Sequence, residues 1–468
     1  MVYDLLYGLD ANFQPHPQMV EGHKVDNDGL VWELTLRDGL RFHDGEKVLA
    51  RDCVACILRW GKRDAFGSAM MSRTAEMAAR SDRVIRIRLK KPFALVPVAL
   101  AQPNCVIMPE RIAKTDANAQ IDDPTGSGPF RFLSDERIQG SRSVYAKFDG
   151  YVPRSEGTTS FLAGPRIVHF DRVVWTFQPD PATSAAALSK GEFDWWENPP
   201  IDLVGMLRAN KDLTVDVKNR MGAIGCIRFN HLYPPFDNPA IRRALLGAVD
   251  QAAAMQAVAG SDPALWRDRI GLFDPGAPLG NDAGIEVLEG PRDYAKVRRE
   301  LTAAGYHGEP IVVLDPTDVS GAHALALVGA DQLRQSGMDV DVQSMDAGTM
   351  FRRRDSKQPI RQGGWNVFFT FMDSTSNFTP FGNPALSGNG VDGWAGWPTS
   401  PRIEELRQAW LDASDLEAEK RICRELQLQL WQDVPYIPMG QCVQQTCYRR
   451  TLTDVPKGPP LFFGVRPA

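Results

Sequence analysis

Hydrophobic and polar residues alternate in two short stretches near the start of the chain. Every second residue between Leu30 and Leu36 is large and apolar, and residues 85–89 repeat the pattern. A period of two places these side chains on one face of a strand. The pair Asp38-Gly39 follows the first stretch and is typical of a tight turn. We therefore expect the first part of the chain to be rich in sheet, with short helices.

The pattern changes between Ile311 and Met345. An apolar run at 311–314 precedes helical spacing from Ala322 to Gln335, and a second strand-like stretch follows. This order and length suit two parallel strands joined by a helical crossover. A shorter helix-then-strand pattern runs from Thr183 to Trp196. Together the two patterns predict two α/β lobes.

Proline after a capping residue predicts where several helices begin. Asn238-Pro239 should start a helix whose apolar residues, from Ile241 to Ala252, lie on one face. Ser400-Pro401 repeats this signal, and a second helix follows until Pro435 ends it. The last segment, Tyr436 to Tyr448, reads as extended chain that returns to a sheet.

Charge and hydropathy exclude two classes of protein. The 468 residues include 53 basic and 58 acidic ones, giving a net charge of -5 without a basic stripe, so nucleic-acid binding is not expected. The longest apolar stretch, Phe93 to Ala101, contains Pro97. It is much shorter than the roughly 20 residues that cross a bilayer, so no transmembrane helix is expected.

Motifs for catalysis, cofactors or metals are weak. Residues 388–393 match the G-x-G-x-x-G fingerprint, but no strand precedes them and Trp394 to Pro398 follow, so we expect a loop. Hydrolase motifs of the H-E-x-x-H and G-x-S-x-G kinds are missing from the sequence. Cys53 and Cys56 form a C-x-x-C that suits a redox pair or half of a zinc site, but two buried small side chains are the favoured interpretation. We predict neither a cofactor nor a metal site.

Cys442 and Cys447 are candidates for a disulfide only in an oxidising compartment. Five residues apart on a strand, their side chains would point to opposite faces. We therefore do not favour this pairing. The seven cysteines do not identify the compartment.

Aromatic residues beside polar ones, glycine or proline form three clusters. They are residues 194–200, residues 365–373, and Trp394 with Trp397. Trp195 and Trp196 are adjacent on a predicted strand, so one can enter a core while the other faces an opening. A single tryptophan usually belongs to a core. Three such clusters favour a cleft that stacks on a ligand and forms hydrogen bonds to it.

These pieces, in this order, resemble the extracellular solute-binding proteins of family 5, which are peptide and nickel receptors of ATP-binding-cassette (ABC) importers. The resemblance spans nearly the whole chain. Its motifs are Asp28 to Gly45 with Ala50-Arg51-Asp52 and Arg59-Trp60, Gly126-Ser127-Gly128-Pro129-Phe130, Phe229-Asn230 with Pro235 to Leu245, Ala303 to Tyr306, and Val434 to Pro438.

The resemblance implies a periplasmic-binding-protein-like α/β fold of type II. Two lobes with mixed β-sheets flanked by helices close about a hinge on a ligand. Residues 1–229 would form lobe I, with an extra subdomain at about 18–160. Residues 230–437 would form lobe II, and residues 438–468 would return to lobe I.

The same resemblance implies a set of ligand-binding residues and no catalytic ones. The stretch from Asp194 to Asn198 matches the segment of the first lobe that contacts a peptide backbone. Phe371 stands where many members carry a cleft tryptophan, and Asp373 lies near the acid that holds a peptide's ammonium group. The full set is Trp195, Trp196, Glu197, Asn198, Phe371, Asp373, Asn377, Asn389, Trp394, Trp397, Met439 and Gln441.

We therefore expect a monomeric periplasmic receptor that carries a short peptide or similar solute to permease subunits in the inner membrane. A receptor of the same fold for a nickel chelate, a sugar or an opine-like solute is the alternative. A hydrolase is a third reading without a visible nucleophile and base. No signal peptide precedes Tyr3 to Leu6, where the family pattern is already under way. We expect Met1 to mark a truncated or misplaced start.

Overall fold

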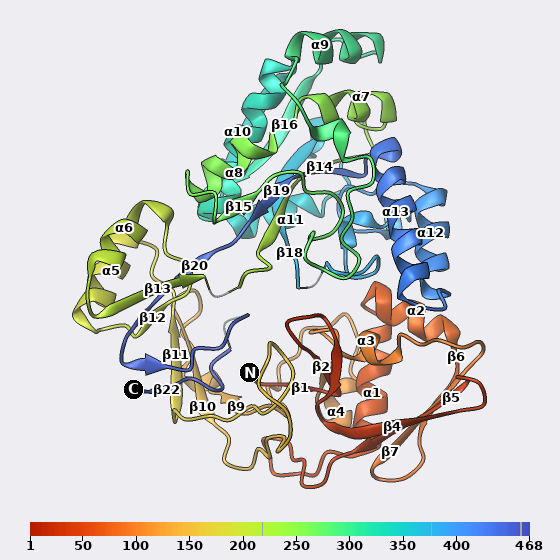
Figure 1. Cartoon of the computed structure of the whole chain (residues 1–468), viewed down its shortest axis with the longest axis vertical. Helices are drawn as coiled ribbons and strands as arrows, with labels where there is room; N and C mark the ends of the chain where they lie inside the picture. The colour runs from red at the N-terminus through yellow and green to blue at the C-terminus, as the bar shows by residue number, and fades with distance from the viewer. Residues whose placement is uncertain (218, 376, 459–460) are drawn as a thin grey trace. The chain divides into compact units, whose positions relative to one another are not determined.

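The computed structural model describes residues 1–217, 219–375, 377–458 and 461–468 (Figure 1). Backbone contacts divide them into two compact units. Unit 1 comprises Met1–Asn219 and Gln445–Ala468, and unit 2 comprises Arg220–Gln444. The lobe limits expected at 229 and 437 stay a prediction, because a lobe is defined by its motion about a hinge.

Unit 1 is built from small antiparallel sheets and short helices. Its strands are β1 (Asp4–Leu5), β2 (Tyr7–Leu9), β3 (Pro15–Pro17), β4 (Val20–Asp26), β5 (Val31–Leu36), β6 (Thr74–Ala79), β7 (Val84–Leu89), β8 (Val106–Ile107), β9 (Phe130–Phe132), β10 (Arg142–Lys147), β11 (Arg172–Thr176), β12 (Trp195–Trp196), β13 (Leu213–Val217), β20 (Gln445–Arg449), β21 (Leu452–Thr453) and β22 (Arg466–Pro467). Its helices are α1 (Ala50–Gly61), α2 (Ala65–Arg73), α3 (Val96–Leu100), α4 (Glu110–Ala113), α5 (Pro181–Lys190) and α6 (Ile201–Ala209).

The two alternating stretches near the start of the chain are confirmed as β5 and β7. They lie side by side in a four-stranded sheet of order β4-β5-β7-β6. Their alternate side chains Leu34, Leu36, Ile85 and Ile87 are all fully buried, at 0% exposed. Helix α1 packs on β6 and β7 and carries Cys53 and Cys56, which are buried as expected. The C-x-x-C residues therefore serve as core side chains.

Unit 2 has one six-stranded sheet among its described residues, with helices on both faces. The strands are β14 (Ala223–Phe229), β15 (Trp266–Arg267), β16 (Pro310–Pro316), β17 (Asp339–Met345), β18 (Val367–Asp373) and β19 (Tyr436–Cys442), in the order β15-β19-β14-β18-β16-β17. The helices are α7 (Pro239–Ala244), α8 (Gln251–Ala259), α9 (Tyr294–Ala303), α10 (Ser320–Gln335), α11 (Ala347–Arg354), α12 (Pro401–Leu411) and α13 (Leu416–Asp433).

The predicted strand, helix, strand unit is confirmed as β16, α10 and β17. Strands β16 and β17 pair in parallel, with Ile311 opposite Val340. Helix α10 packs on β16 and β18, and α8 packs on β19. Along β18 the side chains alternate: Phe369 lies against Gly329 of α10, whereas Phe368 joins a core cluster with Met350 of α11.

One predicted helix is wrong. The stretch after Pro239 is not a single helix through Ala252, because α7 ends at Ala244 and a short 3-10 turn follows. Asp250 then caps a new helix, α8, by accepting a hydrogen bond from the backbone N of Ala253 at 2.9 Å. The aspartate side chain competes with helix continuation and restarts the helix in a new direction.

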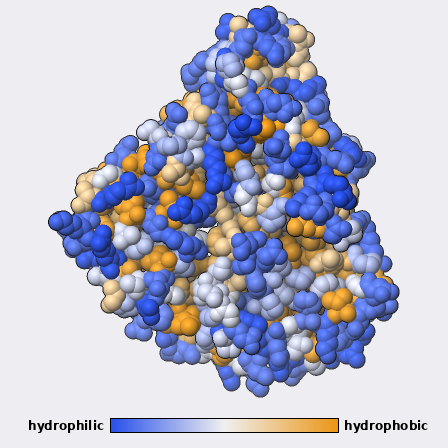
Figure 2. All heavy atoms as spheres, viewed as in Figure 1, coloured by the Kyte–Doolittle hydropathy of each residue, from blue (hydrophilic) through white to orange (hydrophobic). Residues whose placement is uncertain are grey.

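The surface seen in Figure 2 is mostly hydrophilic, with smaller hydrophobic areas between polar ones. Among the described residues, no helix combines the length and apolar content that a bilayer crossing requires. All seven cysteines, including Cys442 and Cys447, are buried free thiols. Burial raises the pKa of the Cys56 and Cys442 thiols to about 12, which keeps both protonated at neutral pH.

Candidate functional site

The carboxyl ends of four strands meet at one edge of the unit 2 sheet. β16, β17 and β18 are parallel to one another. β19 points the same way, because β18 and β19 are both antiparallel to β14. Ligands of open α/β sheets bind beyond the carboxyl ends of the strands. We call this edge, where the four strands end at Pro316, Met345, Asp373 and Cys442, the carboxyl edge.

Gln441 is the centre of a polar cluster at the carboxyl edge. Its side chain is 2% exposed. Its Nε2 donates to the Met221 carbonyl and to Asp274 Oδ2, each at 2.6 Å, and lies 3.3 Å from Ser374 Oγ. These contacts tie the end of β19 to the chain before β14 and after β18. The expected site residue Gln441 therefore lies at this edge among buried polar groups.

Phe371 and Asp373 lie at the end of β18. The Phe371 ring occupies the space above Gly225, where an added Cβ would come within 3.3 Å of both the ring and Met255. The ring is therefore partly packed against α8. Asp373 is exposed, and its Oδ1 accepts hydrogen bonds from the backbone N of Thr375, at 2.7 Å, and from the Thr375 hydroxyl. One oxygen of its carboxylate is thus used locally.

Asn377 and Met439 are 4% and 0% exposed, respectively. Met439 lies in the middle of β19, where all seven residues are buried. Its side chain therefore packs inside the sheet, and its expected contact with a ligand stays a prediction. Asn389 is exposed just before a short 3-10 turn, Gly390–Asp392, and forms an isolated bridge with Thr399. The glycine-rich stretch around it forms this turn and no strand-to-helix junction, as expected.

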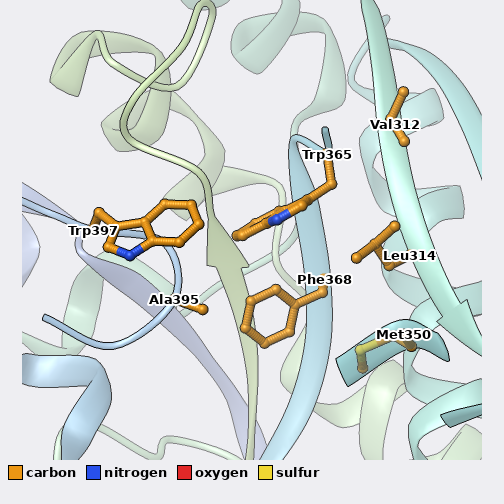
Figure 3. Packing of buried hydrophobic residues seen from close by; sticks show 7 residues of the cluster. All are labelled: Val312, Leu314, Met350, Trp365, Phe368, Ala395 and Trp397. Carbon is orange, nitrogen blue, oxygen red and sulfur yellow. The ribbon is translucent and has the colours of Figure 1, made fainter. Parts of the chain in front are cut away.

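Trp397 belongs to a core cluster of unit 2, and the partly buried Trp394 packs against it. Trp397 is 3% exposed and packs against Trp365, with ring centroids 5.8 Å apart (Figure 3). The guanidinium carbons of Arg228 and Arg354 lie over the Trp394 ring, 5.2 and 5.3 Å from its centroid. Cations and core side chains therefore already engage both indoles. Stacking of the two residues on a ligand stays a prediction.

Arg228 holds this region together, and no carboxylate of the described residues forms an ion pair with it. Its guanidinium is 0% exposed. It donates to the carbonyls of Ala385, Trp394, Ala395 and Pro435 at 2.7 to 3.3 Å. Burial lowers the pKa of this guanidinium to about 10. At neutral pH the charge persists, and four backbone carbonyl dipoles stabilise it.

His231 lies beside Arg228 and Arg242. Burial, followed by repulsion from Arg242 and Arg228, lowers the pKa of its imidazole well below the ordinary value. The ring is neutral at pH 7. Its Nε2 lies 3.2 Å from the Pro435 carbonyl, which can only accept, so Nε2 carries the proton.

The unit 1 candidates lie on the sheet of β12, β20 and β13. Trp195 pairs with Tyr448 and Trp196 with Cys447, so the two indoles point to opposite faces. Trp196 packs against a core cluster with Leu188 of α5. As the sequence suggests, one tryptophan belongs to the core. Trp196 is partly buried, as Trp195 is, and its expected contact with ligand stays a prediction.

Trp195 lies on the other face of this sheet, within a row of aromatic rings. Its centroid is 6.2 Å from that of Tyr448 and 5.2 Å from that of Phe462, and Phe462 also contacts Trp175 at 5.5 Å. The Trp195 Nε1 donates to the Thr446 hydroxyl at 2.6 Å. We call Trp175, Phe462, Trp195 and Tyr448 the aromatic row. Glu197 is half-buried and Asn198 is exposed just beyond β12.

Sequence reasoning missed several residues of these regions. Asp274 and Ser374 meet Gln441 only through the fold, since 167 and 67 residues separate them from it. Phe462 joins the aromatic row from the end of the chain. Arg228 gave a faint signal, as a charged residue in the middle of a strand with buried neighbours. Among the described residues, no group of three or more His, Cys, Asp or Glu is arranged to hold a metal ion.

Comparison with known proteins identifies the family. The profile of bacterial extracellular solute-binding proteins, family 5 Middle, matches residues 14–388. The probable peptide ABC transporter periplasmic-binding protein y4tO of Sinorhizobium fredii is 36% identical over 470 residues, which cover 100% of this chain and 88% of that protein. The glutathione-binding protein GsiB of Salmonella typhi is 25% identical, over 93% of this chain and 82% of that protein.

Solved structures confirm the predicted periplasmic-binding-protein-like fold. The periplasmic binding protein DppA from Helicobacter pylori, in complex with the peptide STSA, superposes with a TM-score of 0.82. The two sequences are 19% identical, and the match covers 99% of this chain and 92% of DppA. Fold, family profile and full-length similarity agree. The chain therefore belongs to the bacterial extracellular solute-binding proteins of family 5.

Proposed function

We propose that this protein is the substrate-binding component of an ABC-type importer in the periplasm. It captures a short peptide or similar small solute in a cleft between its lobes and delivers it to permease subunits in the inner membrane. The observation that carries this proposal is the 36% identity along the whole chain to a probable peptide-binding protein of such a transporter. Family membership also confirms the expectation of a binding protein in place of an enzyme.

The proposed mechanism is ligand-driven closure. A ligand shifts the equilibrium toward a closed state only if it binds that state more tightly than the open one. Contacts from both lobes meet this requirement, because the ligand gains the second set only on closure. The permease then recognises the closed, loaded protein.

The proposed contacts combine stacking with hydrogen bonds. In unit 1 they involve Trp195, Glu197 and Asn198. In unit 2 they involve Phe371, Asp373, Asn377 and Gln441, and Asn389 is a peripheral candidate. The half-buried ring of Trp195 and the polar cluster of Gln441 provide the two kinds of group that small-molecule sites use, apolar surface and a few placed polar atoms.

Native mass spectrometry of freshly purified protein tests the ligand class. Recovery of a bound peptide mass, confirmed by fragmentation, is the expected result. A nickel adduct, or the mass of a glycan or an opine, would instead identify that solute as the ligand. Incubation with a mixture of di- and tripeptides should raise the melting temperature, because a ligand that binds only the folded state stabilises it by mass action.

A pair of tryptophan variants tests the site in unit 1. Trp195→Ala should weaken peptide affinity by about tenfold, through loss of stacking area. Trp410→Phe is the matched control, since Trp410 is 1% exposed on α12 and its Nε1 donates to Glu419. Isothermal titration calorimetry should show control affinity equal to that of the wild type. A Trp195→Ala variant that binds peptide with wild-type affinity would show that Trp195 does not contact the ligand.

A further inference from the structure

Thr446 is a buried residue of β20 that lies on the same face of its sheet as Trp195. β20 is the central strand of this sheet, between β12 and β13. Trp195 lies opposite Tyr448, and Thr446 precedes Tyr448 by two residues, so all three side chains point to one face. Thr446 is 2% exposed. Nothing in the sequence singled it out.

The Thr446 hydroxyl forms hydrogen bonds in both directions. A carbonyl oxygen can only accept, so the hydroxyl donates its proton to the carbonyl of Trp196, at 3.1 Å. An indole N–H can only donate, so Trp195 Nε1 donates to a lone pair of the same hydroxyl oxygen, at 2.6 Å. The backbone of β12 thus fixes the hydroxyl, and the hydroxyl fixes one atom of the Trp195 ring.

Aromatic contacts alone would leave the ring of Trp195 less well defined. Its plane makes angles of 66° with the ring of Tyr448 and 71° with that of Phe462, in edge-on contacts. Aromatic pairs of this kind tolerate a range of centroid distances and offsets, whereas a hydrogen bond requires one atom at a defined distance and angle. The ring is half-buried, so the direction of its N–H decides which part of it remains open.

We propose that Thr446 is a positioning residue for ligand binding, which holds the Trp195 indole so that the ligand meets its ring surface and not its N–H. This inference rests on the proposed function and adds the kind of contact that Trp195 makes. The N–H is the sole hydrogen-bond donor of an indole, and Thr446 occupies it. Trp195 therefore recognises flat or apolar groups of the ligand, and it donates no hydrogen bond to a carbonyl or carboxylate.

The consequence is a preference for ligands with an aromatic side chain. A ring that is already held in place loses little conformational freedom when a ligand stacks on it. Without the Thr446 hydroxyl, binding would have to order the ring, which should weaken the affinity for stacking ligands by about three- to tenfold. Ligands without a ring should lose about twofold or less, because they gain little from the direction of the indole.

The test compares tripeptides that contain phenylalanine with the same tripeptides carrying alanine at that position, by calorimetry. Thr446→Val keeps the shape of the side chain and removes both hydrogen bonds. It should raise Kd about three- to tenfold for the phenylalanine panel, and about twofold or less for the alanine panel. Thr446→Ser retains the hydroxyl and should restore the wild-type Kd. Thr214→Val is the matched control: Thr214 lies opposite Tyr448 on β13, and among the described residues its hydroxyl forms no hydrogen bond to Trp195.

The indole N–H signal of Trp195 gives a readout that does not depend on a ligand. In a nitrogen–proton correlation spectrum, its loss in Trp195→Phe assigns the signal. In Thr446→Val the signal should move and exchange faster with solvent, whereas Thr446→Ser should keep both properties of the wild type. If Thr446→Val does not fold, Thr446→Ala removes the same two hydrogen bonds and should give the same results.

Two outcomes would overturn the positioning role while peptide binding, and with it the proposed function, stands. One is an unchanged indole signal in Thr446→Val. The other is a ratio of the two Kd values, phenylalanine panel to alanine panel, that stays at the wild-type value in Thr446→Val. Failure of the wild-type protein to bind either panel would instead overturn the proposed function and the positioning role together.

Discussion

Trp195 in unit 1 and Trp394 in unit 2 have similar sequence surroundings and different environments. Both are flanked by polar residues, glycine or proline, and both were predicted to stack on a ligand. Trp195 lies on the face of a small sheet opposite its core, next to half-exposed aromatic rings. Trp394 lies under Arg228 and Arg354, beside the core cluster of Trp397.

The difference follows from how each indole is positioned. Neighbouring residues on a strand point to opposite faces, so Trp195 lies on the side opposite the core cluster against which Trp196 packs. Trp394 lies in a loop, where no regular alternation of side chains determines the direction of its ring. There the environment depends on the buried guanidinium of Arg228, which belongs to a distant strand.

The largest expected effect separates the two regions by stability. Trp397→Ala removes a buried indole from the cluster in Figure 3 and should lower the free energy of unfolding by about 3–5 kcal/mol. Trp195→Ala removes a half-exposed ring and should cost only about 1 kcal/mol. Urea unfolding monitored by circular dichroism measures both. Equal losses would show that Trp195 is as much a core residue as Trp397.

Acid should weaken the region of Trp394 before that of Trp195. The folded state holds His231 neutral, because burial and two guanidiniums lower the pKa of its imidazole. The unfolded chain takes up a proton near pH 6.5. The contribution of His231 to the free energy of unfolding is therefore fully present above pH 6.5. Below pH 6.5, the free energy of unfolding should fall by about 1 kcal/mol per pH unit.

Unfolding at pH 8, 6 and 5 tests this pH dependence, with His231→Gln as the comparison. Glutamine retains a donor for the Pro435 carbonyl, which His231 Nε2 contacts at 3.2 Å, and it does not titrate. The variant should lose part of the acid sensitivity. A variant with the same slope as the wild type would assign the sensitivity to other groups.

These regions also show how far the sequence alone could lead. The alternation of apolar and polar residues predicted β5 and β7. The order of strand, helix and strand predicted β16, α10 and β17. Both predictions succeeded because these elements follow from the local sequence pattern. The break between α7 and α8 was not predicted. The apolar spacing continues across it, whereas the capping hydrogen bond of Asp250 starts a new helix.

The candidate site was less predictable than the fold. Motif position located Gln441, but its partners Asp274 and Ser374 come from other parts of the chain. Aromatic content suggested Trp394 and Trp397, but a cation or a core neighbour is invisible without tertiary structure. Local patterns therefore predict elements, whereas long-range partners decide which side chains remain available.

A smaller effect is expected from Phe462→Ala in the aromatic row. The substitution removes ring contacts with Trp195 and Trp175 at 5.2 and 5.5 Å. The free energy of unfolding should fall by about 1 kcal/mol. The emission of Trp195 should shift to longer wavelength as water reaches the ring. A Trp195→Phe background supplies the control, and a shift that persists in it would come from another tryptophan.

The smallest effect is expected from Arg354→Gln at Trp394. The guanidinium of Arg354 lies over three aromatic rings, those of Phe351, Phe368 and Trp394. Loss of its cation–π contacts should cost about 0.5–1 kcal/mol. Quenching by iodide should increase for Trp394, because one cover of the ring is removed, while Trp195 is unaffected. Arg352→Gln on the same helix is the control, since Arg352 donates to the Thr349 hydroxyl and lies over none of the aromatic rings of the described residues. Increased quenching in both variants would point to a general loss of charge near the helix, whereas an increase confined to Arg354→Gln would establish that Arg354 shields the indole.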